Sequence, residues 1–163
     1  MKVFVSKEYN LSETPRGMKM VLVGFLLLIL AGYLVGLAMG VTKGGVTTQS
    51  LAQYYRGTED GLVYPKSLME LLEVAHFHLL SMPVAYLIVA HLLFMTKFRW
   101  RFAIVALGLL GMVLNLIAPF LIRFVAAGLA WLKLTGMLAF GASLVGMIHI
   151  ELFALLFGPR PTR

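Results

Sequence analysis

The feature that most constrains this chain is a run of 21 residues, from Met20 to Gly40, without a charged side chain. At about 1.5 Å per residue, a helix of this length spans roughly 30 Å, which is the thickness of the hydrocarbon core of a bilayer. The run is too long for the apolar core of a secretory signal, and Glu8 and Glu13 precede it. We therefore expect an uncleaved first membrane helix.

Three further apolar stretches complete a predicted membrane domain. The mean hydropathy is +0.90, and charged residues make up only 13% of the chain, a balance typical of integral membrane proteins. We predict an all-α, integral membrane four-helix bundle that forms a single domain over residues 1–163. The spans are expected at about 20–40, 74–96, 102–122 and 134–157, with an extramembrane excursion at 41–72.

Local signals refine the second helix. Ser67 followed three residues later by Glu70 is typical of a capping box, so this helix is expected to begin outside the lipid. Pro83 removes one backbone hydrogen bond and predicts a kink near the middle of the membrane.

The last apolar stretch, 124–157, is too long for one upright span. Lys133 divides this stretch. We therefore expect the part up to Lys133 to be interfacial or looped, and the fourth helix to begin at Leu134.

Lysine and arginine residues are distributed unevenly over the two sides of the predicted bundle. The two terminal tails and the short connection 97–101 together carry nine of them, and the other connections carry five. By the positive-inside rule, both termini are expected in the cytoplasm, and the excursion in the periplasm, of a bacterial inner membrane. The net charge of +7 comes from residues at the ends of apolar runs, so we expect no nucleic-acid partner.

Three of the four histidines, His76, His78 and His91, fall in one apolar stretch, and the fourth is His149. An ionisable side chain inside a membrane is costly and indicates a functional site by default. His91 and His149 are expected roughly 7–8 Å and 12 Å from the cytoplasmic side. We expect the two imidazoles to face one another across two antiparallel helices, where they can serve as axial ligands of a haem iron.

The spacing of His76 and His91 suggests that this helix offers one haem ligand near each membrane face. The two are 15 positions apart, which places them about 60° apart around a helix and about 22 Å apart along it. In this four-span layout and spacing, the chain resembles the four-helix haem core of the membrane b-type cytochromes, in which paired histidines hold one haem near each membrane face. The resemblance implies one or two b-type haems. The family has two histidines on each of two helices, whereas the last helix here has only His149.

The outer site is therefore left open. His76 and His78 are about 200° apart around a regular helix and cannot share one metal there. One of them ligates a haem with a ligand from another chain or with Met137, or one of them lines a pocket for a quinone head group. Arg123 and Lys133 are expected to anchor the outer interface or to meet haem propionates. Asn115 and Pro119 are expected either to compensate for each other within their helix or to line a pocket.

Small residues recur at helical spacing on two of the predicted helices. In lipid, such stripes let helices approach closely, and the second of these can also accept the edge of a flat macrocycle. The first stripe consists of Gly24, Gly32, Gly36 and Gly40, and the second of Thr135, Ala139, Ala142 and Gly146, followed by His149.

These patterns predict a small membrane subunit that binds haem b, with quinone as a further candidate ligand. It would carry electrons between quinol and a partner, as an electron-transfer subunit rather than an enzyme alone. The expected partners are the lipid bilayer and other membrane or periplasmic electron-transfer subunits, in a homo- or hetero-oligomer. The absence of cysteine excludes iron–sulfur ligation and covalent haem attachment through this chain.

Two alternatives stay open. The first is a haem-free accessory or assembly subunit of a larger membrane complex. The second is a proton or metal transporter that uses Glu151 as a proton-relay carboxylate. The lack of a visible inverted repeat argues against the transporter.

Overall fold

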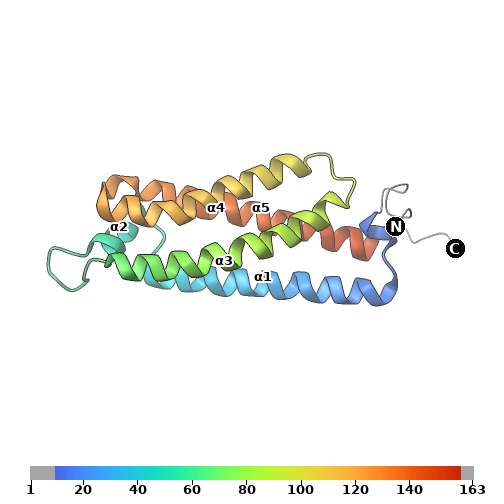
Figure 1. Cartoon of the computed structure of the whole chain (residues 1–163), viewed down its shortest axis with the longest axis horizontal. Helices are drawn as coiled ribbons and strands as arrows, with labels where there is room; N and C mark the ends of the chain where they lie inside the picture. The colour runs from blue at the N-terminus through green and yellow to red at the C-terminus, as the bar shows by residue number, and fades with distance from the viewer. Residues whose placement is uncertain (1–9, 159–163) are drawn as a thin grey trace.

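The computed structural model describes residues 10–158, and in this part of the chain every regular element is a helix. The four long helices lie side by side along the long axis (Figure 1), and each is long and apolar enough to cross a membrane. The predicted all-α membrane fold is confirmed. In chain order the elements are η1 (Leu11–Glu13), α1 (Arg16–Gly44), α2 (Thr48–Arg56), α3 (Leu68–Phe94), α4 (Arg101–Phe124), η2 (Ala127–Leu129) and α5 (Ala130–Phe157).

The long helices alternate in direction along the chain (Figure 1). As a result, α3 and α5, which carry His91 and His149, run in the same direction. The expectation that these two helices are antiparallel was wrong, because the second and fourth of four alternating spans must be parallel. Helix α2 lies at one end of the bundle, called the α2 end below. The first and last described residues lie at the other, called the termini end.

The predicted capping box at the start of α3 is present. Ser67 Oγ accepts a hydrogen bond from the Glu70 backbone N–H at 3.2 Å, and a carboxylate oxygen of Glu70 accepts from the Ser67 N–H at 2.8 Å. Pro83 lies inside α3, and the helix changes direction in its middle (Figure 1), as expected where a backbone hydrogen bond is missing.

The last helix begins earlier than expected. The turn η2 is followed directly by α5, whose first residue is Ala130, so Lys133 lies within the helix. Residues 125–129 do form a connection between the long helices, but the expectation that this interfacial or looped segment extends to Lys133 was wrong for residues 130–133. A lysine near the first turn of a membrane helix is tolerated here because its ammonium group finds acceptors inside the protein, as described below.

Glycines let the backbones of α4 and α5 approach closely, whereas the predicted glycine stripe of α1 makes no such contact. A Cβ on Gly136 would lie 2.8 Å from the Asn115 backbone nitrogen, and one on Gly111 would collide with the backbone of α5, so the two helices pack closely. In contrast, a Cβ at each of the predicted stripe glycines of α1 would meet nothing within 4 Å. Only 6% of the most apolar window of α1 is buried, so this stripe makes no close contact within the chain.

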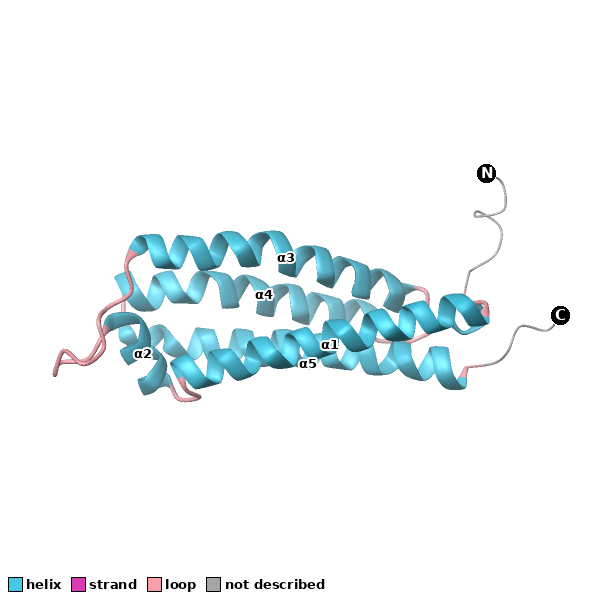
Figure 2. Ribbon diagram, turned by 90° about the horizontal axis from the view of Figure 1, so that it is seen from below, coloured by secondary structure: helices cyan, strands magenta, loops and turns pink. Residues whose placement is uncertain are grey.

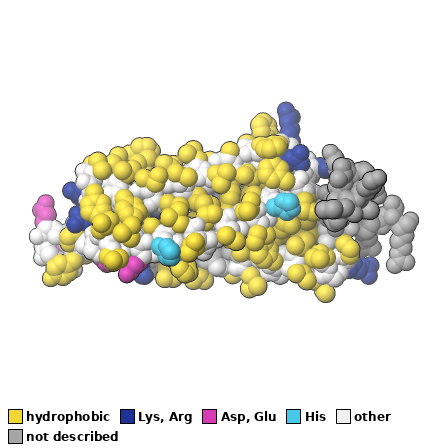
Figure 3. All heavy atoms as spheres, in the orientation of Figure 1, with side chains coloured by type: hydrophobic (Ala, Val, Ile, Leu, Met, Phe, Trp, Pro, Cys, Tyr) yellow, Lys and Arg dark blue, Asp and Glu magenta, His cyan; other side chains and the backbone are white. Residues whose placement is uncertain are grey.

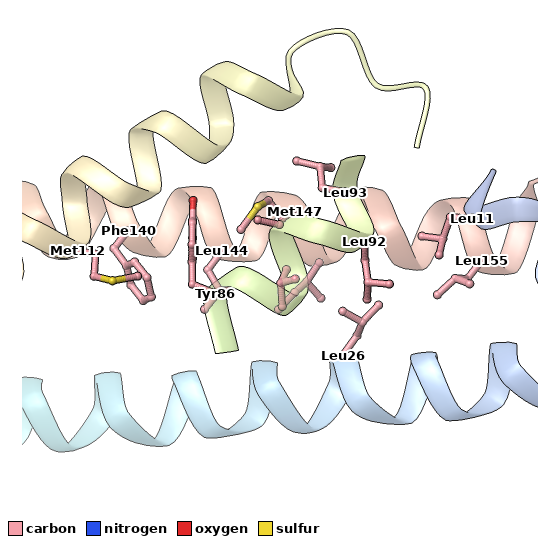
Figure 4. Packing of buried hydrophobic residues seen from close by; sticks show 13 residues of the cluster. Leu11, Leu26, Tyr86, Leu92, Leu93, Met112, Phe140, Leu144, Met147 and Leu155 are labelled. Carbon is pink, nitrogen blue, oxygen red and sulfur yellow. The ribbon is translucent and has the colours of Figure 1, made fainter. Parts of the chain in front are cut away.

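The main core fills the half of the bundle towards the termini end. Buried side chains of η1, α1, α3, α4 and α5 form one cluster (Figure 4). Leu11 of η1 points towards Leu155 of α5 in this cluster (Figure 4), and the Leu11 N–H donates to the Met95 carbonyl at 2.9 Å. The face shown in Figure 3 is mainly hydrophobic, with lysine and arginine near its two ends, as expected for a protein surrounded by lipid.

A polar contact ties three helices together at the centre of the bundle. The Tyr86 hydroxyl of α3 lies 2.9 Å from the Val105 carbonyl of α4 and 2.9 Å from Ser143 Oγ of α5. Ser143 Oγ also donates to the Ile104 carbonyl at 2.8 Å. Gly108 makes room for both hydroxyl groups, since a Cβ there would collide with each of them.

Candidate functional site

The half of the bundle towards the α2 end contains a polar pocket of about 260 Å³. Its size approaches that of small-molecule sites, which are typically about 300 Å³ or more. All five α-helices contribute to its walls. It is lined by Lys43 of α1; Tyr54 and Tyr55 of α2; Lys66; Glu70, Leu71, Glu73, Val74, Ala75 and His78 of α3; Asn115, Leu116, Pro119 and Phe120 of α4; and Lys133 of α5.

Lys133 is held in this pocket by a carbonyl group that Pro119 leaves without a backbone hydrogen bond. In a regular helix, the Asn115 carbonyl would accept a hydrogen bond from the N–H of residue 119, but proline has none. The Lys133 ammonium group donates to this free carbonyl at 3.0 Å and also to the side-chain oxygen of Asn115. Because an ammonium group has three donors, one N–H is left for a ligand. The three residues therefore form one unit across α4 and α5.

His78 lies half-buried on the α3 wall of the pocket. Its Nδ1 lies 2.8 Å from the Val74 carbonyl oxygen of the preceding turn. A carbonyl can only accept, so Nδ1 carries the proton of this hydrogen bond. In the neutral ring, Nε2 is then an acceptor, and no described residue donates to it.

The charges around the pocket are unbalanced. Three lysines and two glutamates line it, and the one ion pair among the described residues joins Lys66 Nζ to Glu70 at 2.7 Å. The hydrogen bond to Glu70 raises the pKa of Lys66. Lys133 has no carboxylate partner among residues 10–158. The interior of the pocket therefore favours a ligand group that accepts hydrogen bonds or carries negative charge.

Helix α2, which the sequence interpretation left as part of a polar excursion, packs against this end of the bundle (Figure 2). Leu51 and Tyr55 are buried in a second core cluster with α3, α4 and α5, and burial raises the pKa of the Tyr55 hydroxyl, which stays protonated. Arg56 donates to the last carbonyls of α4 at 3.1 and 3.2 Å. The signal that could have revealed α2 is the reciprocal cap of Thr47 with Ser50.

Part of the pocket lining is exposed. Lys43 of α1 and Glu73 and Val74 of α3 line the pocket and are themselves exposed. Helix α1 packs mainly on α5 and α2, and at the α2 end Figure 2 shows it on the α5 side of the bundle, apart from α3. A ligand held in the pocket can therefore keep a long apolar tail outside it.

The other three histidines point away from the bundle interior. His91 is exposed and lies two residues from Val89 and from Leu93, both fully buried. Its ring therefore projects about 160° from the buried face. His149 is exposed in the same way, two residues from the fully buried Met147. His76 is exposed as well.

The predicted similar depth of two of these histidines agrees with the helix register. The Tyr86–Ser143 contact sets α3 beside α5. His91 lies five residues beyond Tyr86, and His149 lies six residues beyond Ser143. Their depths therefore differ by only about 2 Å. Depth alone does not bring them together, because each ring lies on the outward face of its helix.

The residues present do not fit a haem inside the bundle of one chain. Between α3 and α5 at this depth, Val89, Leu93, Met147 and Ile148 are 0–1% exposed and belong to one packed cluster. A flat macrocycle would have to displace them. Among the described residues, no group of three or more histidine and acidic side chains is arranged to hold a metal ion. Iron ligation by His91 or His149 stays a prediction that requires a second chain.

The remaining predicted residues have separate surroundings. Glu151 is 0% exposed on α5, and neither carboxyl oxygen has a hydrogen-bond partner in the described part of the chain. Arg123 Nε donates to the Lys66 carbonyl at 2.7 Å, so Arg123 holds the connection before α3 in place. Met137 is half-buried on α5 and does not line the pocket.

A family model described as a transmembrane helical domain matches residues 45–162. The chain belongs to the Aq_1264_TM family of transmembrane helical domains. The matched range of the Aq_1264_TM domain begins one residue after the end of α1 and includes every pocket residue except Lys43. No curated protein and no solved structure matches the chain significantly.

Proposed function

We propose that this protein is a membrane subunit that binds the head group of a quinone-type ligand in the pocket at the α2 end. It would serve electron transfer between quinol and a partner subunit. The observation that carries the proposal is the half-buried Lys133 ammonium group, held by Asn115 beside Pro119, in a pocket whose lining includes exposed residues of α1 and α3. A quinone combines what this site requires: a hydrogen-bond acceptor, a flat ring and an apolar tail.

The chemistry of the site supports this class of ligand. The free N–H of Lys133 can donate to a quinone oxygen, and a charged donor makes a stronger hydrogen bond than a neutral one. Phe120, Pro119 and Leu116 supply apolar walls for the ring. Negative charge that develops on the oxygen during electron transfer would be stabilised by the same ammonium group.

The proposal includes an orientation. The excess of lysine and arginine at the termini end supports a cytoplasmic location for that end and a periplasmic location for the pocket, in a bacterial inner membrane. The ligand would then exchange electrons with a membrane or periplasmic partner. The chain itself supplies the binding site, and the redox centre would belong to the assembled complex.

A direct binding measurement tests the proposal. The full chain, in nanodiscs, is titrated with decylubiquinone and followed by calorimetry. We expect saturable binding that the Lys133→Met substitution weakens by roughly 10- to 100-fold, because a hydrogen bond to a charged group is lost. Lys43→Met is the matched control: this lysine lies exposed at the pocket mouth, and its removal should change the affinity by less than about threefold.

Two results would overturn the proposal. One is the absence of saturable binding of both decylubiquinone and its reduced form, decylubiquinol, to the folded wild-type chain. The other is an equal loss of affinity in the two lysine variants, which would mean that charge in general, rather than the held ammonium group, attracts the ligand. Circular dichroism of both variants checks that the helices are intact.

A further inference from the structure

The direction of the hydrogen bond at His78 restricts which ligand groups can bind there, beyond what the shape of the pocket allows. Nδ1 donates to the Val74 carbonyl at 2.8 Å, so in the neutral ring the other nitrogen, Nε2, is an acceptor, and the side chain that carries it lines the pocket. The tautomer is set by the helix backbone, before any ligand binds. A ligand group at this wall therefore has to donate a hydrogen bond.

Lys133 sets the opposite requirement at another wall of the same pocket. Two of its donors are used by the two oxygens of Asn115, and an ammonium group has no lone pair. A ligand group at this wall has to accept a hydrogen bond. The pocket therefore favours a ligand that donates one hydrogen bond to His78 and accepts another from Lys133.

The oxidised and reduced forms of a quinone differ in this respect. Both oxygens of a quinone are carbonyls, which accept only; one placed at Nε2 would set two lone pairs against each other and leave this half-buried acceptor unsatisfied. A quinol has two hydroxyl groups, each of which can donate or accept. It can donate one hydroxyl proton in a hydrogen bond to His78 while its other oxygen accepts from Lys133.

We propose that the pocket is selective for the reduced form, a quinol, and that His78 is the residue that determines this selectivity. The inference rests on the proposed function, because it assumes that a quinone-type ligand occupies the pocket. It deepens that function by naming quinol as the form that the site takes up. The site would then face the donor side of electron transfer, where quinol enters, rather than the side where quinone is reduced.

A pair of matched ligands tests the selectivity. Decylubiquinol and decylubiquinone are titrated anaerobically against the full chain in nanodiscs. We expect the quinol to bind up to about tenfold more tightly, the effect of one satisfied rather than unsatisfied hydrogen bond at the pocket wall. The dimethyl ether of decylubiquinol, which has the same skeleton but no donor, should bind as weakly as the quinone.

Variants assign the effect to one side chain. His78→Phe should remove the preference for quinol, whereas His78→Gln, which keeps an acceptor oxygen, should retain part of it. His76→Phe is the matched control, because His76 lies on the same helix turn but points about 160° away. The His76→Phe variant should prefer quinol over quinone to the same extent as the wild type.

The possible outcomes separate the two proposals. If wild type binds both forms equally, or if His78→Phe keeps the preference, the selectivity proposal is overturned and the quinone pocket stands. If neither form binds to the wild-type chain, the proposed function itself fails. A quinol preference that disappears in His78→Phe and survives in His76→Phe supports both.

Discussion

The Gly108→Ala substitution tests how tightly the side chains at the centre of the bundle are packed. A Cβ at this position would collide with the hydroxyl groups of both Tyr86 and Ser143, which meet the carbonyls of Ile104 and Val105 on α4. The two hydroxyl groups hold only two protons, so two hydrogen bonds are donated at a time.

The magnitude follows from three terms. Loss of two hydrogen bonds within a membrane protein costs about 1–3 kcal/mol, and overpacking a tight site costs about 1–3 kcal/mol. Alanine in place of glycine favours the helix by up to about 1 kcal/mol. We therefore expect Gly108→Ala to lower the free energy of unfolding by about 1–6 kcal/mol, with a central value of about 3 kcal/mol.

Unfolding of the detergent-solubilised chain by sodium dodecyl sulfate, followed by circular dichroism, measures this effect. The matched control is Gly32→Ala, at a position where a Cβ meets nothing within 4 Å; its stability should be equal to or slightly above that of the wild type. In a chain that also carries Tyr86→Phe and Ser143→Ala, the Gly108→Ala penalty should shrink by about half. A Gly108→Ala variant as stable as the Gly32→Ala variant would refute the reasoning.

Two further predictions concern the residues outside the pocket. Glu151→Leu should raise the unfolding midpoint, with a gain of about 1–3 kcal/mol in stability. The reason is that an apolar side chain of similar volume replaces a fully buried carboxyl group without hydrogen-bond partners. A clear loss of stability would show that the carboxyl group has a partner and would contradict this prediction. The packing between α3 and α5 predicts that the monomeric chain binds no stoichiometric haem b. A reduced-minus-oxidised spectrum and a pyridine haemochrome count would measure the haem content. If the monomer contains haem and His91→Leu or His149→Leu removes it, the packing argument is contradicted.

Much of the candidate site was visible in the sequence only as separate residues. The sequence distinguished His78, Asn115 and Pro119 within predicted helices and Lys133 just before one, and a quinone pocket was one of the expectations for His78. The structure brings all four into one pocket. Sequence spacing could not do this, because the four residues lie on three different helices, and a pocket depends on how those helices pack.

The expectations for His91 and His149 show the opposite case. Their depth could be predicted, because rise per residue and helix direction fix it. Their orientation could not, because these helices are apolar on nearly every side and offer no polar face that marks the outside. Close contact at Gly111 and Gly136 between α4 and α5 helps to set the rotation of α5, and with it the outward direction of His149.

The sequence by itself determined that this protein is a bundle of four membrane helices, with a capped start at Ser67. Both properties are local: without water in the bilayer, a long apolar segment has to satisfy its backbone as a helix, and a cap depends on neighbouring residues only. Tertiary structure alone decided which helix faces meet, that α2 helps to line the pocket, and that Lys133 reaches the carbonyl freed by Pro119. The physical reason is that helix association in lipid depends on shape and on a few polar contacts, which no single helix contains.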